Sequence, residues 1–221
     1  NADRFEVVAL CELNAERLKQ GAEQYRIPAL YTDADRMLAE TRPDVFCFVT
    51  EPAVRLEMVE LAAKHGVRGL AFEKPMATSL REAWRIAELC REHDIRAVVS
   101  HQQKYLTSMQ QLKQIVDGGD VGEVTAIHGT CLPWLSQLGT HYMDYILWVN
   151  GAARARWAVG HLHGKGKLAD SHPSPDYLLG QVLFDNGVRA ILECGYLAPA
   201  HLRHLSTSSL SAVGYSSTRK Q

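Results

Sequence analysis

The chain has 221 residues, which is enough for one large domain or two small ones. Its 24 Lys and Arg residues balance its 25 Asp and Glu residues, so the net charge of -1 attracts neither nucleic-acid phosphates nor anionic lipids. No apolar run reaches the roughly 20 residues of a membrane-spanning helix, and residues 1–4 lack the apolar segment of a signal peptide. We therefore expect a soluble, cytoplasmic protein that binds neither nucleic acid nor membranes.

The first hundred residues alternate short apolar runs with amphipathic segments, which is the pattern of strand–helix units around a parallel sheet. Asn14 and Ser79 are predicted to cap helices that run to about Tyr25 and His93, because their side-chain oxygens can accept bonds from first-turn amides. The other elements expected here are strands over 5–11, 45–50, 67–72 and 95–100, and helices over 33–40 and 53–65.

The second part of the chain changes character, with one helix over 106–116 followed by longer strand-like segments. Asp185-Asn186-Gly187 predicts a hairpin turn between the last two strands, so an antiparallel sheet is expected. Residues 206–221 are rich in serine and lack an apolar period, so we expect them to be frayed or linker-like. The strands expected in this part are 124–131, 157–163, 177–184 and 188–196.

The five cysteines are widely spaced and odd in number, which disfavours both a disulfide framework and a paired-cysteine zinc site. Several of them fall inside apolar, strand-like runs, so buried free thiols are expected. His161 and His163 share one face of a predicted strand, but neither a cysteine nor a carboxylate is spaced to complete a metal site with them. We therefore expect no metal.

Five motifs occur in a fixed order along the chain, and together they resemble the Gfo/Idh/MocA oxidoreductases from about Phe5 to Tyr196. They are residues 8–12 with Asn14 and Arg17, the Thr50-Glu51-Pro52 loop, Glu73-Lys74-Pro75, the turn at 119–124, and Gly139-Thr140-His141-Tyr142-Met143-Asp144.

The resemblance implies an α/β protein. Residues 1–101 would form a Rossmann-type parallel sheet that binds a dinucleotide, and residues 102–205 an α+β substrate and oligomerisation domain with a mainly antiparallel open sheet. Residues 206–221 would be a serine-rich tail. It also implies a homo-oligomer in the complete protein.

Two features of the family are not found in the sequence. The family's first strand and Gly-rich loop, whose glycines let the backbone approach the cofactor pyrophosphate, have no counterpart here. That strand would lie in the middle of the sheet, and the family's later strands are also missing beyond Tyr196. We therefore expect the chain to be a fragment of a longer protein.

The resemblance implies NAD as the cofactor. Glu12 ends a strand where this fold places an acid that binds the adenosine ribose hydroxyls and repels a 2′-phosphate, which favours NAD over NADP. The alternative is a solvated carboxylate at a helix start. Thr50 and Pro52 are expected at the nicotinamide ribose, and Glu73 is expected to position Lys74 or to contact the cofactor.

Lys74 and His141 are the expected proton-handling pair. Lys74 would bond the substrate hydroxyl and the cofactor ribose, beside a Pro75 peptide that the resemblance implies is cis; a surface lysine is the alternative. His141 would accept the hydroxyl proton as hydride leaves the same carbon, a role suited to a pKa near neutrality; a structural histidine is the alternative. Asp144, one helical turn on, could orient His141 or bind substrate.

Gln137 and Tyr105 complete the expected substrate site. Gln137 stands four residues before His141, where the family often has an acid, and it can hydrogen-bond a polyol but not transfer a proton. Tyr105, next to Lys104, follows the last strand of the first domain, where similar family segments face the substrate; helix-start packing is the alternative.

Three functions are consistent with these residues. The first is an oxidoreductase that transfers hydride between NAD and a sugar, inositol or related polyol. The second is a non-catalytic regulatory protein that binds a nucleotide or sugar, which Gln137 and the missing Gly-rich loop favour. The third is an NAD-dependent glycosidase, in which transient oxidation beside the anomeric carbon assists departure of the leaving group.

Overall fold

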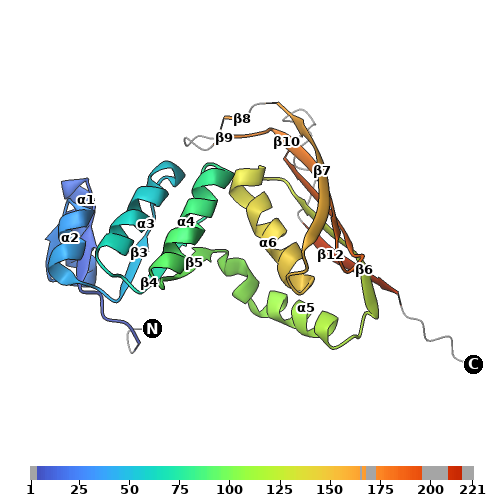
Figure 1. Cartoon of the computed structure of the whole chain (residues 1–221), viewed down its shortest axis with the longest axis horizontal. Helices are drawn as coiled ribbons and strands as arrows, with labels where there is room; N and C mark the ends of the chain where they lie inside the picture. The colour runs from blue at the N-terminus through green and yellow to red at the C-terminus, as the bar shows by residue number, and fades with distance from the viewer. Residues whose placement is uncertain (1–3, 165, 168–172, 196–208, 216–221) are drawn as a thin grey trace, which may run out of the picture. The chain divides into compact units, whose positions relative to one another are not determined.

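The structure is a computed structural model that describes residues 4–164, 166–167, 173–195 and 209–215 (Figure 1). The chain divides into two compact units, Asn1–Ser100 and His101–Gln221, and each is described by itself. Among the described residues, no helix is both long enough and apolar enough to cross a bilayer.

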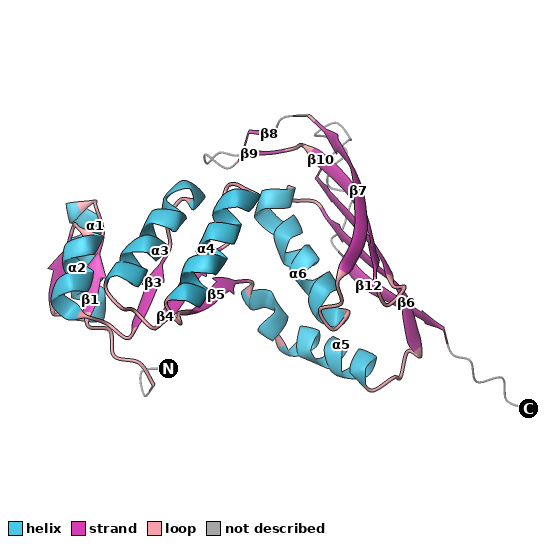
Figure 2. Cartoon of the chain, viewed as in Figure 1, coloured by secondary structure: helices cyan, strands magenta, loops and turns pink. Residues whose placement is uncertain are grey.

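Unit 1 alternates strands and helices, and all of its strand pairs are parallel, in the orders β1-β2 and β3-β4-β5. The fold class predicted for this part is therefore confirmed. Helices α3 and α4 lie side by side in this unit (Figure 2). Its elements are β1 (Ala9–Cys11), α1 (Ala15–Tyr25), β2 (Ala29–Tyr31), α2 (Ala34–Thr41), β3 (Val45–Phe48), a 3₁₀ turn (Pro52–Val54), α3 (Arg55–Lys64), β4 (Gly69–Glu73), α4 (Leu80–Glu92) and β5 (Arg96–Ser100).

The helix starts of unit 1 follow from their capping residues. The Asn14 side chain accepts hydrogen bonds from the amides of Glu16 and Arg17, both at 3.0 Å, and Ser79 Oγ accepts one from the Glu82 amide at 3.2 Å. Each bond satisfies a first-turn donor that has no partner within its helix. Both predicted caps are confirmed.

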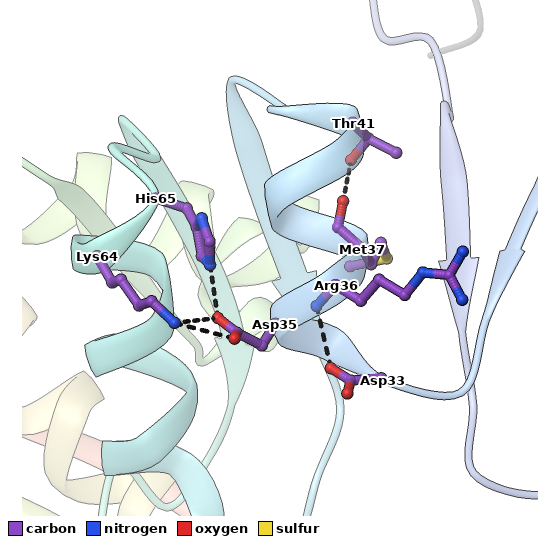
Figure 3. Close-up of polar contacts among 7 residues, drawn as sticks. All are labelled: Asp33, Asp35, Arg36, Met37, Thr41, Lys64 and His65. Carbon is purple, nitrogen blue, oxygen red and sulfur yellow. Dashed lines mark hydrogen bonds and ion pairs between the residues drawn. The ribbon is translucent and has the colours of Figure 1, made fainter.

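Helices α2 and α3 are joined by a carboxylate on the first turn of α2 (Figure 3). Lys64 Nζ donates to the two Asp35 oxygens at 2.8 and 2.9 Å, and His65 Nε2 lies 2.6 Å from Asp35 Oδ1. Asp33, which caps α2, accepts the Arg36 amide at 3.0 Å in the same view (Figure 3). The hydrogen bonds from Lys64 and His65 hold the pKa of Asp35 below its usual value.

The core of unit 1 forms on one face of β3 and β4. Phe48 and Phe72 stack with ring centroids 5.0 Å apart, and they pack with residues such as Val59 of α3 and Ile86 of α4. Because side chains alternate along a strand, Cys47 points to the opposite face of β3, where it is exposed. The expectation of a buried thiol is therefore wrong for Cys47.

Unit 2 contains a five-stranded sheet of order β12-β6-β11-β10-β7, whose pairs are antiparallel except β6–β11. The mainly antiparallel sheet that the sequence predicted is confirmed. Its elements are a 3₁₀ turn (Gln102–Tyr105), α5 (Thr107–Asp117), β6 (Glu123–Cys131), a π-helical turn (Leu135–Gly139), α6 (Thr140–Val149), β7 (Ala155–His163), β8 (Gly166–Lys167), β9 (Pro173–Ser174), β10 (Tyr177–Phe184), β11 (Arg189–Gly195) and β12 (Ser209–Tyr215).

One prediction for this unit is wrong. Residues 206–221 were expected to be frayed or linker-like, yet Ser209–Tyr215 form strand β12, which pairs antiparallel with β6. The main-chain groups at the edge of β6 provide this pairing, and such bonds do not require the apolar period that the segment lacks.

The β10–β11 hairpin closes through the predicted turn. Gly187 has φ 84°, a left-handed conformation that glycine adopts without a steric penalty, and the Val188 amide donates to Asn186 Oδ1 at 3.2 Å.

Helix α6 approaches the sheet closely at a second glycine. A Cβ placed on Gly129 of β6 would lie 3.1 Å from the Tyr142 ring and 3.5 Å from Ile146 Cδ1. The absence of a side chain there lets the buried face of α6 settle onto the sheet. This contact sets the position of the first turn of α6, which carries His141.

Candidate active site

All of the cofactor residues predicted in unit 1 except Glu12 lie at the end of β4 or follow β3 or β4. These strands are parallel neighbours in the register Phe48↔Phe72, so the residues that follow them emerge at one edge of the sheet. In open α/β sheets, ligands bind at this carboxyl edge. We call Thr50, Pro52, Arg55, Glu73 and Lys74 the strand-end cluster.

Arg55 joins the two loops of this cluster. Its Nη2 donates to the Thr50 carbonyl at 2.9 Å and to the Lys74 carbonyl at 3.3 Å, and the residue is only 2% exposed. Burial lowers the pKa of the Arg55 guanidinium, while the carboxylates of Glu73 and Glu51 act in the opposite direction. This residue was not predicted from the sequence. Its signal is a charged side chain at helical spacing from a buried position of α3, Val59.

Lys74 is half-buried, and the Lys74–Pro75 peptide bond is cis, as the resemblance implied. The Lys74 amide lies 3.3 Å from Glu73 Oε2, to which it donates. Glu73 therefore contacts the backbone of Lys74. The Thr50 hydroxyl and the Arg55 Nε and Nη1 atoms are buried and have no hydrogen-bond partner among the described residues. Such orphaned polar atoms fit a ligand rich in hydroxyl and carbonyl groups, as the ribose and carboxamide of NAD are.

Glu12 directly follows β1, as predicted. Its Oε1 accepts the Asn14 amide at 2.8 Å, which places the carboxylate at the start of α1. This is the contact expected from the alternative interpretation, a carboxylate at a helix start. A carboxylate has several acceptor positions, so binding of ribose hydroxyls stays a prediction.

The catalytic residue predicted in unit 2 lies in a polar cluster on the first turns of α6. His141 is 3% exposed, and its ring meets the His101 ring edge-on, with centroids 5.0 Å apart and planes at 89°. Its Nδ1 lies 3.4 Å from the Tyr145 hydroxyl, one turn along the helix. We call His101, Gln103, Lys104, His141, Asp144 and Tyr145 the helix cluster.

Asp144 has a different neighbourhood from the predicted one. Its Oδ2 lies 3.1 Å from Lys104 Nζ, and its Oδ1 lies 4.0 Å from His101 Nδ1. The carboxylate thus pairs with residues of the segment that precedes α5. Its binding to a substrate stays a prediction.

The two remaining predicted substrate residues face solvent within unit 2. Gln137 lies exposed in the π-helical turn that leads into α6. Tyr105 is 68% exposed, with Lys104 Nζ 5.8 Å from its ring centroid. This exposure disfavours the alternative in which Tyr105 packs at a helix start.

Sequence reasoning missed His101, Gln103 and Tyr145. His101 is the first residue after β5 in the sequence, Gln103 lies in the 3₁₀ turn that follows, and Tyr145 stands four residues after His141. Among the described residues, no group of histidine, cysteine, aspartate and glutamate side chains could hold a metal ion.

Residues 1–101 match the model of GFO_IDH_MocA, an oxidoreductase family with an NAD-binding Rossmann fold. The chain is 30% identical over 117 residues to a D-apiose dehydrogenase from Rhizobium rhizogenes, a match that covers 53% of the chain and 34% of that protein. It is 25% identical over 173 residues to a D-xylose dehydrogenase from Paenarthrobacter nicotinovorans, covering 77% of the chain and 41% of that protein. The match thus spans well under half the length of each of these curated relatives.

The fold has a solved counterpart along almost the whole chain. The WlbA dehydrogenase from Bordetella pertussis, crystallised with NADH and UDP-GlcNAcA, superposes with a TM-score of 0.79 at 18% identity. This superposition covers 97% of the chain and 69% of that structure. Residues 1–101 therefore match the Gfo/Idh/MocA family of oxidoreductases with its NAD-binding Rossmann fold, and the chain shares the fold of a solved dehydrogenase over almost its whole length.

Proposed function

We propose that the protein is an NAD-dependent oxidoreductase that transfers hydride between NAD and a CH–OH group of a sugar, inositol or related polyol. The observation that carries the proposal is the strand-end cluster, in which Arg55 holds the Thr50 and Lys74 loops together beside orphaned donors. The curated relatives support the substrate class, since both are named as dehydrogenases of a sugar.

In this proposal residues 1–101 hold the cofactor. Glu12 binds the adenosine ribose, while Thr50, Pro52, Glu73 and Lys74 line the nicotinamide half. The carboxylate of Glu12 repels a 2′-phosphate, which favours NAD over NADP. When bound, NAD supplies the hydride-accepting ring.

Residues 102–205 hold the substrate in this proposal. Tyr105, Gln137 and Asp144 hydrogen-bond its hydroxyl groups. Lys74 donates a hydrogen bond to the reacting hydroxyl, and His141 accepts the proton of that hydroxyl as the hydride departs from the same carbon, so that a carbonyl forms. In the reverse reaction His141 returns the proton.

The proposal includes a homo-oligomer formed through the face of the unit 2 sheet that carries Trp157 and Val159. These side chains are 47% and 50% exposed, and their residues pair with Leu183 and Gln181 of the neighbouring strand β10. An exposed apolar face of this kind is typical of a protein–protein interface. Sedimentation of wild type and Val159→Lys tests it, since the variant should dissociate. The cytoplasmic location stays a prediction from the sequence.

The deciding experiment measures turnover and NAD binding by the full-length gene product. With a sugar or polyol that is turned over, we expect Lys74→Ala and His141→Ala each to lower the rate by roughly two to four orders of magnitude, since each removes proton handling. Lys19→Ala, at an exposed position of α1, is the matched control and should leave the rate unchanged.

Three outcomes separate the candidate functions. Reduced cofactor that accumulates in proportion to oxidised substrate identifies the dehydrogenase. Release of an aglycone without net reduced cofactor identifies the glycosidase. Binding of NAD or sugar with no turnover of any polyol identifies the regulatory protein, and near-normal rates in both variants refute the assigned proton-handling residues.

A further inference from the structure

His141 lies at one end of a chain of side-chain contacts inside unit 2. Tyr145 lies four residues after His141 on α6, and both side chains are buried at 3% exposure. The Tyr145 hydroxyl lies 2.9 Å from Gln103 Oε1 and 3.4 Å from His141 Nδ1. A buried imidazole cannot exchange partners with water, so its protein partners, this chain among them, favour one ring nitrogen for the proton.

The direction of the bonds follows from the proton count of the phenol. A tyrosine hydroxyl has one proton to donate, and Tyr145 donates it to the Gln103 carbonyl oxygen, which can only accept. The phenol oxygen then has only lone pairs left for His141. A hydrogen bond between this oxygen and His141 Nδ1 then requires Nδ1 to carry the hydrogen and donate it, which puts the lone pair of the neutral ring on Nε2.

The protonation state of Tyr145 keeps this arrangement in place near neutral pH. Burial, with smaller contributions from Tyr142 and Asp144, raises the pKa of Tyr145 to about 12. The phenol therefore keeps its proton in the range where a histidine works as a base. The titratable side chains nearby are Lys104 and Asp144, which pair with each other at 3.1 Å, and His101, whose ring meets that of His141 edge-on.

We propose that Tyr145 and Gln103 are positioning residues that fix His141 in the tautomer with Nδ1 protonated, so that Nε2 is the nitrogen that accepts the substrate proton. The catalytic part of this inference rests on the proposed function, but the tautomer itself does not. When Nε2 is protonated, the Nδ1–H bond to Tyr145 is retained, so the imidazole can accept and return a proton without a change in its orientation.

The test is histidine-selective ¹⁵N NMR on the full chain, in which two-bond couplings distinguish protonated from unprotonated ring nitrogens. His141→Gln assigns the signal by its disappearance. In the wild type we expect Nδ1 of His141 to be protonated and Nε2 not. In Tyr145→Phe, which removes the acceptor, we expect the tautomers to become mixed, with the Nε2-protonated form rising several-fold.

Gln103→Glu provides a sharper second variant. A carboxylate can only accept from Tyr145, so the wild-type tautomer should persist, whereas Gln103→Met should mix the tautomers as Tyr145→Phe does. If Tyr145→Phe does not fold, the Gln103 variants still allow the tautomer of His141 to be measured. Tyr177→Phe, which removes a tyrosine hydroxyl that donates to Glu193 at 2.7 Å, is the matched control and should leave His141 unchanged.

Two results overturn the inference. One is a wild-type His141 protonated on Nε2, which would mean that the Gln103 amide group donates to Tyr145 and Tyr145 donates to His141. The other is an unchanged tautomer in both Tyr145→Phe and Gln103→Met.

The spectra need neither NAD nor substrate, so they are independent of the proposed function. If the tautomer is as stated but His141→Ala keeps full turnover, the proposed function fails and the inference stands. If both hold, Tyr145→Phe should lower kcat roughly ten-fold, a part of the 10²–10⁴ that general base catalysis contributes, without changing the Kd for NAD.

Discussion

Substitutions of Arg55 can distinguish the stabilisation that its hydrogen bonds provide from the destabilisation caused by burying its charged side chain. The two bonds from Nη2 to backbone carbonyls are charge-assisted and contribute about 1.5–3 kcal/mol each. Against them, Nε and Nη1 are buried without partners among the described residues, at about 1–3 kcal/mol each. The two sums are similar, so a substitution that removes both contributions should change stability little.

Arg55→Met should therefore be more stable than Arg55→Lys, although lysine conserves the charge and methionine does not. Methionine fills much of the same volume without buried donors, and we expect its unfolding free energy to stay within about 1 kcal/mol of wild type. Lysine ends one bond before the position of Nη2, so it loses both carbonyl bonds and still buries an ammonium. We expect it to be about 2–4 kcal/mol less stable than the methionine variant.

The assay is chemical denaturation of both variants, with hydrogen exchange at the loops after β3 and β4. Arg36, whose side chain is 70% exposed and pairs with Glu40, provides the control: its Met and Lys variants should lie within about 0.5 kcal/mol of wild type. In both Arg55 variants the loop amides should exchange faster, because the tie between the loops is lost. A lysine variant as stable as the methionine variant would refute this reasoning.

Three further predictions concern stability and thiol reactivity. Asp35→Asn should lower stability most near neutral pH, because a carboxylate whose pKa is lower in the folded state than in the unfolded state stabilises the fold at pH values above the unfolded-state pKa. The difference from wild type should vanish as acid protonates the folded carboxylate, and a pH-independent difference would contradict this. Cys47 should react with a thiol reagent in the native protein, whereas Cys131 and Cys194 should react only on unfolding, because both are buried. The hydrogen bond with Cys194, together with burial, also raises the pKa of Cys131. Mass spectrometry of the labelled peptides decides it. Ser79→Ala should cost about 1 kcal/mol by loss of the α4 cap, and an unchanged melting temperature would count against it.

The elements that the sequence predicted well are those whose signals are local. The caps at Asn14 and Ser79 and the Asp185-Asn186-Gly187 turn depend on residues a few positions apart, and the structure has all three. Strand β12 was missed because its formation depends on β6, which lies far away in the sequence. Strand β2 was missed because its three residues are too few to show a period.

The exposure of Cys47 shows the same limit. A continuous apolar run over Val45–Phe48 predicts a strand buried on both faces. In the structure Phe46 and Phe48 are buried, whereas Val45 is 42% exposed and Cys47 is exposed. Which faces of a strand are covered depends on packing partners that the run itself does not specify.

Only some residues of the candidate site could be predicted from the sequence. Lys74 and His141 were proposed from the sequence because their side chain types suit proton handling and both stand in motifs. Arg55 and Tyr145 were not, because each acts on an atom remote from the reacting group. Arg55 donates to the carbonyl of Lys74, and the Tyr145 hydroxyl lies beside His141 Nδ1, so each contacts an atom other than the one with the proposed chemistry.

Substitutions of reacting residues and of positioning residues should affect turnover differently. Removing Lys74 or His141 deletes a reacting group, so turnover falls whatever the rest of the site does. Removing Arg55 or Tyr145 leaves every reacting group present but frees its position or its tautomer. The positioning variants should therefore retain measurable turnover, and conservative substitutions that restore the bonding pattern, such as Gln103→Glu, should retain most of it. Only hydrogen-bond direction and burial, which a structure provides and a motif does not, distinguish these two groups.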